Sequence, residues 1–223
     1  MYISGPALQI AVSYEQNIPE EIVSHFVSEI ASPGLDVKSE AREPGFQAGF
    51  VWLVPTAVII FIGKAYFDSF LKEMGKDHYS LLKKSITALW KYFFGNERTI
   101  KVNLVSTKGK VSSEAQYSSS FSLMSDVLVE YRLKYLLKDN ISQADFEKSI
   151  AQFFSFLEER SSGVLNPEIR QHLESKGIIG RTILLTYDDG KLKVLHNKCT
   201  NLIRVKFGLI LVLVIARAGY GKR

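Results

Sequence analysis

The stretch Gly45 to Gly63, GFQAGFVWLVPTAVIIFIG, is uncharged throughout, and its environment determines whether the chain belongs in a membrane or in water. The hydrocarbon core of a bilayer needs about 20 apolar helical residues, or about 17 at the short end. Trp52 lies near one end of the stretch and Tyr66 lies beyond the other, beside Lys64, as aromatic rings and cations do at lipid headgroups. Pro55 opposes this interpretation only weakly, because neighbours in a membrane satisfy the carbonyl that proline leaves free. The stretch therefore fits a transmembrane helix.

The charges on its two sides give that helix a direction. Residues 1–44 carry two basic and seven acidic side chains, a net charge of −5, whereas residues 64–110 carry ten basic and four acidic ones, a net charge of +6. The basic flank of a span normally stays in the cytoplasm, which predicts an outside N-terminus and a mostly cytoplasmic chain. The segment MYISGPALQIAVSYEQ, however, lacks the pattern of a signal peptide. The alternative is a soluble cytoplasmic domain in which the same stretch is a buried core helix covered on every side.

The composition fits an ordered protein of one or two domains. The chain has 223 residues, of which 46% are hydrophobic and 23% are charged. Its net charge of +5 is compatible with anionic lipid or nucleic acid as a partner, although a basic surface alone requires neither. The single cysteine, Cys199, excludes a framework of disulfides within the chain.

The N-terminal part predicts a strand-helix-strand unit. Leu8 to Tyr14 alternate between apolar and small or polar residues, which indicates a half-buried strand. A helix follows, with Asn17 as its expected cap, Pro19 at its first position and an apolar stripe that ends at Ile30. Residues 35–42 alternate again with one charged face, which predicts a strand near a sheet edge.

The central part predicts helices. The apolar stretch continues at helical spacing to Met74, and a second helix, with Asp77 as its expected cap, runs towards Gly95. This second helix has an aromatic face and several lysines near its opposite side. It fits either an amphipathic helix packed on a sheet or a helix that lies in a lipid interface.

The C-terminal part is rich in expected strands. Residues 99–105 and 127–135 show strand patterns, two helices are expected near residues 143–160 and 167–176, and the Asp-Asp-Gly sequence predicts a hairpin near residues 181–196. The uncharged segment Phe207 to Ala216 is too short to span a membrane as a helix, so we expect a core strand or a tail that touches lipid. The predicted fold class is therefore α+β (mixed α/β), with residues 1–95 and 96–223 as two parts or as one continuous domain.

The sequence contains no catalytic, metal or cofactor signature. His196 and Cys199 are at most half of a zinc site, because tetrahedral zinc needs two further ligands. Asp188 and Asp189 stand before lysines as in metal-dependent nucleases, but the following glycine makes a turn the simpler explanation. No phosphate-binding loop, nucleophile elbow or HExxH pair is present.

A second nuclease-like pattern is Glu130, Arg132 and Lys134, which alternate on the polar face of an expected strand. They lack a well-placed acidic partner upstream, so we do not expect metal-dependent cleavage. Basic residues between Arg98 and Lys110 lie close to Tyr117 and fit a platform for single-stranded nucleic acid, which we regard as a lesser alternative.

These observations favour a non-catalytic, membrane-associated interaction or accessory protein, bound to membrane lipid or to a protein partner. The alternatives are a soluble binding or regulatory module and, third, an enzyme of unknown reaction. The expected membrane-insertion residues are Phe50, Trp52, Val54, Val58, Ile59, Ile60, Phe61 and Ile62. The expected contacts to anionic headgroups are Lys64, Lys72, Lys83, Lys84 and Lys91. The sequence specifies neither the oligomeric state nor the partner.

Overall fold

The computed structural model describes residues 8–43, 56–74, 76–95, 98–106, 116–128, 131–163, 182–195 and 210–216, with Pro167 and Gln171. Its main element is a seven-stranded mixed sheet of strand order β2-β1-β3-β5-β6-β7-β8. These strands are β1 (Ile10–Glu15), β2 (Val37–Arg42), β3 (Val58–Ile62), β5 (Tyr117–Leu128), β6 (Tyr131–Lys138), β7 (Thr182–Asp188) and β8 (Lys191–Val194). A separate antiparallel pair joins β4 (Ile100–Ser106) to β9 (Ile210–Ala216).

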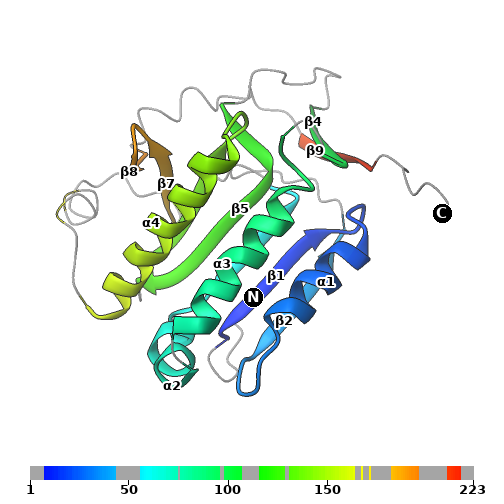
Figure 1. Cartoon of the computed structure of the whole chain (residues 1–223). Coiled ribbons are helices and arrows are strands. Elements are labelled where there is room, and N and C mark those ends of the chain that lie inside the picture. The colour runs from blue at the N-terminus through cyan, green and yellow to red at the C-terminus, as the bar shows by residue number, and fades with distance from the viewer. Residues whose placement is uncertain are drawn as a thin grey trace.

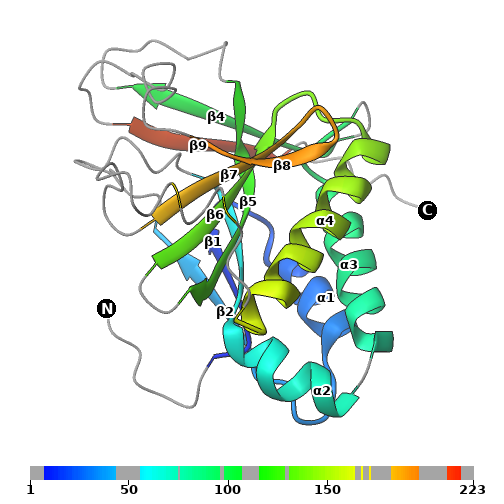
Figure 2. The same ribbon diagram turned by 90° about the vertical axis from the view of Figure 1, so that its left-hand side faces the viewer.

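The helices gather on one face of the large sheet, as Figure 2 shows. They are α1 (Glu20–Ile30), a π-helical turn η1 (Tyr66–Phe70), α2 (Leu71–Met74), α3 (Lys76–Trp90) and α4 (Gln143–Ser161). In Figure 1, α1, α3 and α4 run side by side over the sheet, roughly along the direction of β1 and β5. This arrangement of a mixed sheet and helices confirms the predicted α+β class. Strands from both residues 1–95 and residues 96–223 join the same sheet.

The apolar stretch that suggested a helix contains the central strand β3, so the prediction of a helix over residues 58–62 is wrong. β3 lies between β1, with which it pairs antiparallel, and β5, with which it pairs parallel. Val58, Ile60 and Ile62 are completely buried, while Ile59 and Phe61 are half-buried on the other face. A strand covered on both faces reads as a continuous apolar run, and β-branched side chains suit it. Such a run cannot be distinguished from a buried helix by periodicity alone.

The prediction of a transmembrane helix over this stretch is not supported by the structure. No helix in the described part of the chain is long and apolar enough to cross a bilayer. Of the expected insertion residues, Val58, Ile59, Ile60, Phe61 and Ile62 form β3, which is bonded to a strand on each side. The remaining three, Phe50, Trp52 and Val54, lie outside the described residues.

The N-terminal strand-helix-strand unit is confirmed as β1, α1 and β2, and β2 occupies the expected sheet edge. Asn17 does not cap α1, because the N-cap position is Pro19 and no side chain there accepts a hydrogen bond. Asp77 likewise lies in the first turn of α3 rather than at its cap. The expected end of this helix is close to the observed one, since α3 ends at Trp90 and Gly95 follows with φ of +79°.

The core lies between the helices and the sheet. Large aromatic rings fill it in stacked pairs, with ring centroids 5.0 Å apart for Tyr135 and Phe153 and also for Trp90 and Phe146. His78 joins three helical segments within this core. Its Nε2 donates to the carbonyl oxygen of Ile30 at 2.8 Å, and its Nδ1 accepts from the hydroxyl of Tyr66 at 3.1 Å. Both ring nitrogens are satisfied, which explains the burial of this histidine structurally.

The C-terminal part differs from the prediction at one expected strand. The expected strand over residues 127–135 is divided between β5 and β6, which pair antiparallel with Leu128 opposite Tyr131. The alternation of apolar residues continues through the reversal, so the pattern alone did not show it. The helix near 143–160 is confirmed as α4, and the Ser142 side chain accepts from the amide of Asp145 at 3.1 Å. The helix expected near 167–176 lies outside the described residues, apart from single positions.

The last two predicted features are also strands. The hairpin is confirmed as β7 and β8, joined through Asp189 and Gly190, both with positive φ of 49° and 77°. Two successive positive φ angles are those of the tight hairpin turn that Asp-Gly favours. The apolar C-terminal segment forms β9 and pairs with β4 rather than with the large sheet.

Candidate functional site

The sheet face opposite the helices carries a group of buried polar side chains. Strand alternation directs Glu15, Arg42, Ser122 and Lys134 to this face, and Thr56, just before β3, reaches Ser122. We call these five residues the sheet-face cluster. Four of them are at most 3% exposed, and Arg42 is 25% exposed at its side chain. The cluster thus brings together residues from four strands and from the segment that leads into β3.

Arg42 is held rigidly over the beginning of β3. Its Nη2 donates to the carbonyl oxygens of Thr56 at 3.1 Å and Ala57 at 3.3 Å. Its Nε is buried and has no hydrogen-bond partner. Burial lowers the pKa of Arg42, and the carboxylates of Glu15 and Glu40 oppose this effect. A guanidinium remains charged in proteins, so Arg42 presents a fixed cation whose buried Nε–H donor has no partner.

Glu15 is the acidic member of the cluster and stands at the end of β1. Its Oε1 lies 4.0 Å from Nη1 of Arg42, too far for the charge-assisted hydrogen bond of about 2.8 Å that such pairs can form. Its Oε2 is buried without a hydrogen-bond partner. Burial raises the pKa of Glu15, while Arg42 acts in the opposite direction. An unsatisfied buried polar group costs about 1–3 kcal/mol, so Oε2 of Glu15 and Nε of Arg42 both destabilise the folded state.

Lys134 lies in the middle of β6 between the buried residues Leu133 and Tyr135. Only 3% of this lysine is exposed. Burial lowers its pKa to about 8, and the positive charge of Arg42 contributes in the same direction. Lys134 is therefore still mainly protonated at neutral pH, but it loses its proton far more readily than an exposed lysine.

Hydroxyl groups complete the polar surface. Thr56 Oγ1 and Ser122 Oγ lie 2.8 Å apart, within hydrogen-bond distance. On the same face, Thr186 of β7 is 3% exposed and its Oγ1 is buried without a partner. A hydroxyl both donates and accepts, so these side chains can bind oxygen atoms of a ligand beside the two cations.

The chemistry of the cluster suits anionic oxygens better than metal ions. It combines a planar guanidinium donor, an ammonium group and hydroxyls with a single carboxylate, whereas cation sites are built mainly from carboxylate, imidazole or thiolate ligands. Across the described residues, no group of three His, Cys, Asp or Glu side chains is placed to hold a metal ion. The cluster contains no nucleophile paired with a general base, so binding is the function that its geometry supports most directly.

The lysines expected to contact headgroups lie at different places. Lys64 pairs with Asp68, and Nζ of Lys83 lies 4.2 Å from the ring centroid of Tyr79. Lys72 is exposed on α2. Lys84 is exposed in the C-terminal half of α3, and Lys91 is exposed immediately after this helix. The structure does not gather the five into one patch with the apolar β3, because β3 is inside the sheet.

The two nuclease-like patterns have different outcomes. Asp188 accepts hydrogen bonds from Lys138 and from Lys193 at 3.0 Å, and these two contacts lower its pKa to about 2. Asp189 accepts from Lys193 at 2.7 Å, so the acidic pair of the turn is engaged in ion pairs. Of the other pattern, Lys134 enters the sheet-face cluster, Arg132 is exposed, and Glu130 lies outside the described residues, as do His196 and Cys199.

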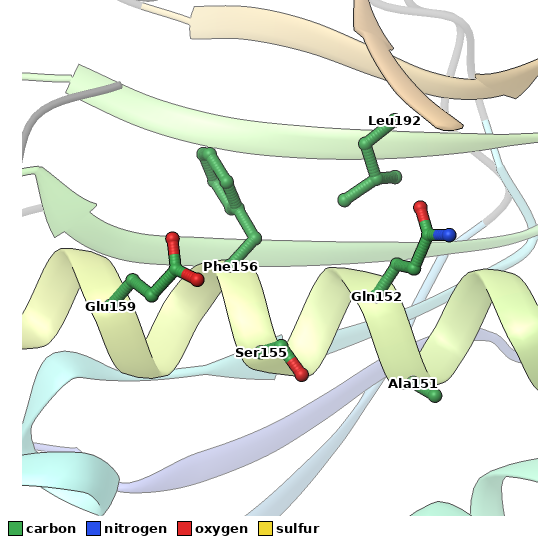
Figure 3. A pocket seen from close by; sticks show the side chains of 6 residues that line it. All are labelled: Ala151, Gln152, Ser155, Phe156, Glu159 and Leu192. Carbon is green, nitrogen blue, oxygen red and sulfur yellow. The ribbon is translucent and has the colours of Figure 1, made fainter.

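A hollow of about 330 Å³ lies between α4 and β8 and is shown in Figure 3. The side chains of Gln152 and Phe156 extend towards Leu192, and Gln152 donates to the carbonyl oxygen of Gly190 at 2.8 Å. Among the described residues that line it, Glu159 is the ionisable one, alongside Ala151 and Ser155. This hollow therefore lacks the convergent polar groups of the sheet-face cluster.

Sequence reasoning singled out Lys134 but missed Glu15, Arg42, Thr56 and Ser122 as its neighbours. One available signal was the charge of Lys134 in the otherwise apolar segment Leu133 to Leu137, which indicates either a partner or a function. Comparisons of the chain with protein-family models, with curated proteins and with solved structures give no significant match.

Proposed function

We propose that this chain is a non-catalytic binding module whose ligand presents an anionic oxygen group, a phosphate or a carboxylate, to the sheet-face cluster. The observation that supports it most is the partly buried guanidinium of Arg42, whose Nε is buried. Two carbonyl oxygens fix its Nη2, while its Nε has no partner. An Nε–H donor in a fixed plane is well suited to an anionic oxygen, and the bond would satisfy a group that is otherwise buried at a cost.

Lys134 and the hydroxyls support the same proposal. A ligand anion near Lys134 would favour its protonated form and raise its lowered pKa. Thr56 and Ser122 supply hydroxyls within the same cluster. Glu15 opposes an anion by its charge; burial raises the pKa of this carboxyl, and Arg42 acts in the opposite direction.

Titration of the full chain with inorganic phosphate, followed by two-dimensional amide NMR, tests the proposal. We expect saturable shifts at the amides of Ala57, Ser122 and Lys134. Arg42→Gln removes the guanidinium, and Lys134→Met removes the ammonium with little change of volume, so each should weaken binding at least about tenfold. Lys84→Gln removes an exposed charge elsewhere and serves as the matched control.

The pH dependence provides an independent readout. Because Lys134 loses its proton with a pKa of about 8, phosphate affinity should fall as the pH rises through this value. An exposed lysine would hold its affinity up to about pH 10. Shifts confined to exposed lysines, or binding equally sensitive to Lys84→Gln and Lys134→Met, would contradict the proposal.

Peripheral association with anionic lipid is the second candidate. It is supported by Lys84 in α3 and Lys91 directly after this helix, which are both exposed. Flotation of the protein with phosphatidylserine vesicles tests it: the double variant Lys84→Gln, Lys91→Gln should stay unbound, while Arg42→Gln should still float. Failure of the unsubstituted chain to float would exclude this candidate.

A further inference from the structure

Among the strands that the structure describes, β2 is paired on one side and leaves its outer edge unpaired. β2 is the first strand of the sheet, and β1 is its one neighbour among the described strands (Figure 1). Lys38, Ser39, Glu40 and Ala41 are all exposed. Unpaired edges attract further strands, and proteins usually protect them with charged side chains, proline or a bulge. The segment Val37–Arg42 contains no proline and carries charges of both signs.

The hydrogen bonds to β1 show which backbone groups of β2 point outwards. The amide of Ile10 donates to the carbonyl oxygen of Asp36 at 3.1 Å, and the amide of Gln16 donates to that of Arg42 at 2.9 Å. Asp36 and Arg42 therefore direct their backbone groups towards β1. Since these groups alternate along a strand, the outward residues are Val37, Ser39 and Ala41.

Because Val37, Ser39 and Ala41 point outwards, a second β2 can pair antiparallel with the first in only some registers. In a hydrogen-bonded antiparallel pair, outward residues must face outward residues, so the two-fold axis passes through a residue and not between two. An axis at Ser39 or Glu40 overlaps five residues of each β2. An axis at Lys38 or Ala41 overlaps three, and an axis at either end of the strand overlaps one.

An axis at Lys38 places two Lys38 side chains opposite each other. An axis at Glu40 does the same with two glutamates and also places Lys38 opposite Arg42 of the other copy. Both registers oppose like charges, which is destabilising.

The other register with five overlapping residues is complementary at every charged position. With the axis at Ser39, Lys38 of each copy lies opposite Glu40 of the other, and Asp36 lies opposite Arg42. Val37 then faces Ala41, and Ser39 faces itself, as the hydrogen-bonded pairs. The charged residues fall at the non-hydrogen-bonded positions, where Cα atoms approach to about 4.5 Å and side chains are closest.

We propose that β2 is a self-association edge, and that two copies of this chain pair antiparallel through Val37–Arg42 with the two-fold axis at Ser39. The seven-stranded sheet of one copy then continues into that of the other. The overlap and the charge pattern along β2 select one register and one partner, a second copy of the same chain.

Sedimentation velocity of the full chain from micromolar to several hundred micromolar tests the proposal. We expect a concentration-dependent dimer that weakens with added salt, because cross-strand ion pairs are exposed. Lys38→Glu and Glu40→Lys each place like charges opposite one another in both copies and should weaken association at least about tenfold. A monomeric chain at every concentration would overturn the proposal.

Mixing the two variants distinguishes pairing from damage to the fold. In a mixed dimer of Lys38→Glu with Glu40→Lys, each acidic side chain lies opposite a basic one, so association should return although each variant alone is monomeric. The double variant K38E/E40K should likewise dimerise by itself. Mixed samples that stay monomeric would show that these residues do not face each other.

Ser39→Pro tests the backbone component. The amide of Ser39 points away from β1, so proline there removes a bond between copies but none within the sheet. The variant should lose the dimer and keep the thermal unfolding midpoint of a monomeric charge variant. A dimer that survives Ser39→Pro and both charge variants would mean that another surface associates.

Discussion

We expect Lys134 to lower the free energy of unfolding relative to an apolar residue of its size, by an amount that depends on pH. Its pKa falls from the ordinary 10.5 to about 8 on folding, chiefly because burial disfavours the charged form. Each unit corresponds to about 1.4 kcal/mol, so keeping the proton at pH 7 destabilises the folded state by about 3 kcal/mol. Lys134→Met fills similar space without a charge, and we expect it to stabilise the protein at pH 7 by about 1–3 kcal/mol.

The direction of the pH effect follows from the two pKa values. Between pH 8 and 10.5 the unfolded chain holds its Lys134 proton while the folded protein has released it, so stability of the unsubstituted protein rises with pH across this range. Above pH 10.5 the lysine is neutral in both states and its cost disappears. The advantage of Lys134→Met should therefore be full below pH 8 and should shrink towards pH 10.5.

Urea denaturation of both proteins in steps from pH 7 to pH 10.5 measures this difference, and titration of all other groups cancels in the comparison. Lys84→Met is the control, since an exposed lysine should change stability by less than about 0.5 kcal/mol at any of these pH values. A Lys134→Met protein that is less stable at pH 7, or an advantage that stays constant up to pH 10, would refute the reasoning.

Three further substitutions test the fold, each by urea or thermal denaturation. Ile60→Ala, at the completely buried centre of β3, should cost about 2–5 kcal/mol, whereas a loss below 1 kcal/mol would contradict the central position of this strand. Gly63→Ala would place a Cβ 2.1 Å from the carbonyl oxygen of Leu8 and should cost about 1–3 kcal/mol; an unchanged unfolding midpoint would contradict that close approach. Ser142→Ala removes the hydrogen bond to the amide of Asp145 and should cost about 1 kcal/mol, with Ser142→Asp retaining most of the stability.

Local patterns predicted most of the secondary structure. The alternation before Tyr14, the stripe of α1 and the Asp-Gly turn each depend on neighbours a few residues away, and each prediction is confirmed. Cap positions at the beginnings of α1 and α3 were wrong by a few residues, because several polar side chains near a helix start satisfy the same pattern.

The conformation of β3 could not be obtained in this way. An apolar run records that its surroundings are apolar, but not whether they are lipid, helices or strands. Here the deciding partners are β1, more than forty residues earlier, and β5, more than fifty residues later. The sheet-face cluster was hidden for the same reason, since its members come together only when β1, β2, β5, β6 and the segment before β3 take their places.

The position of β3 has a consequence for synthesis of the chain. β3 ends at Ile62, but its parallel neighbour β5 is complete only at Leu128. At about 5–20 residues per second, a ribosome takes roughly 3–13 s to supply that strand. During this interval one side of the segment Val58-Ile59-Ile60-Phe61-Ile62 has no strand to pair with, and such β-branched apolar segments readily join other chains. The yield of folded protein should therefore depend on chaperones that shield the nascent chain until β5 has emerged.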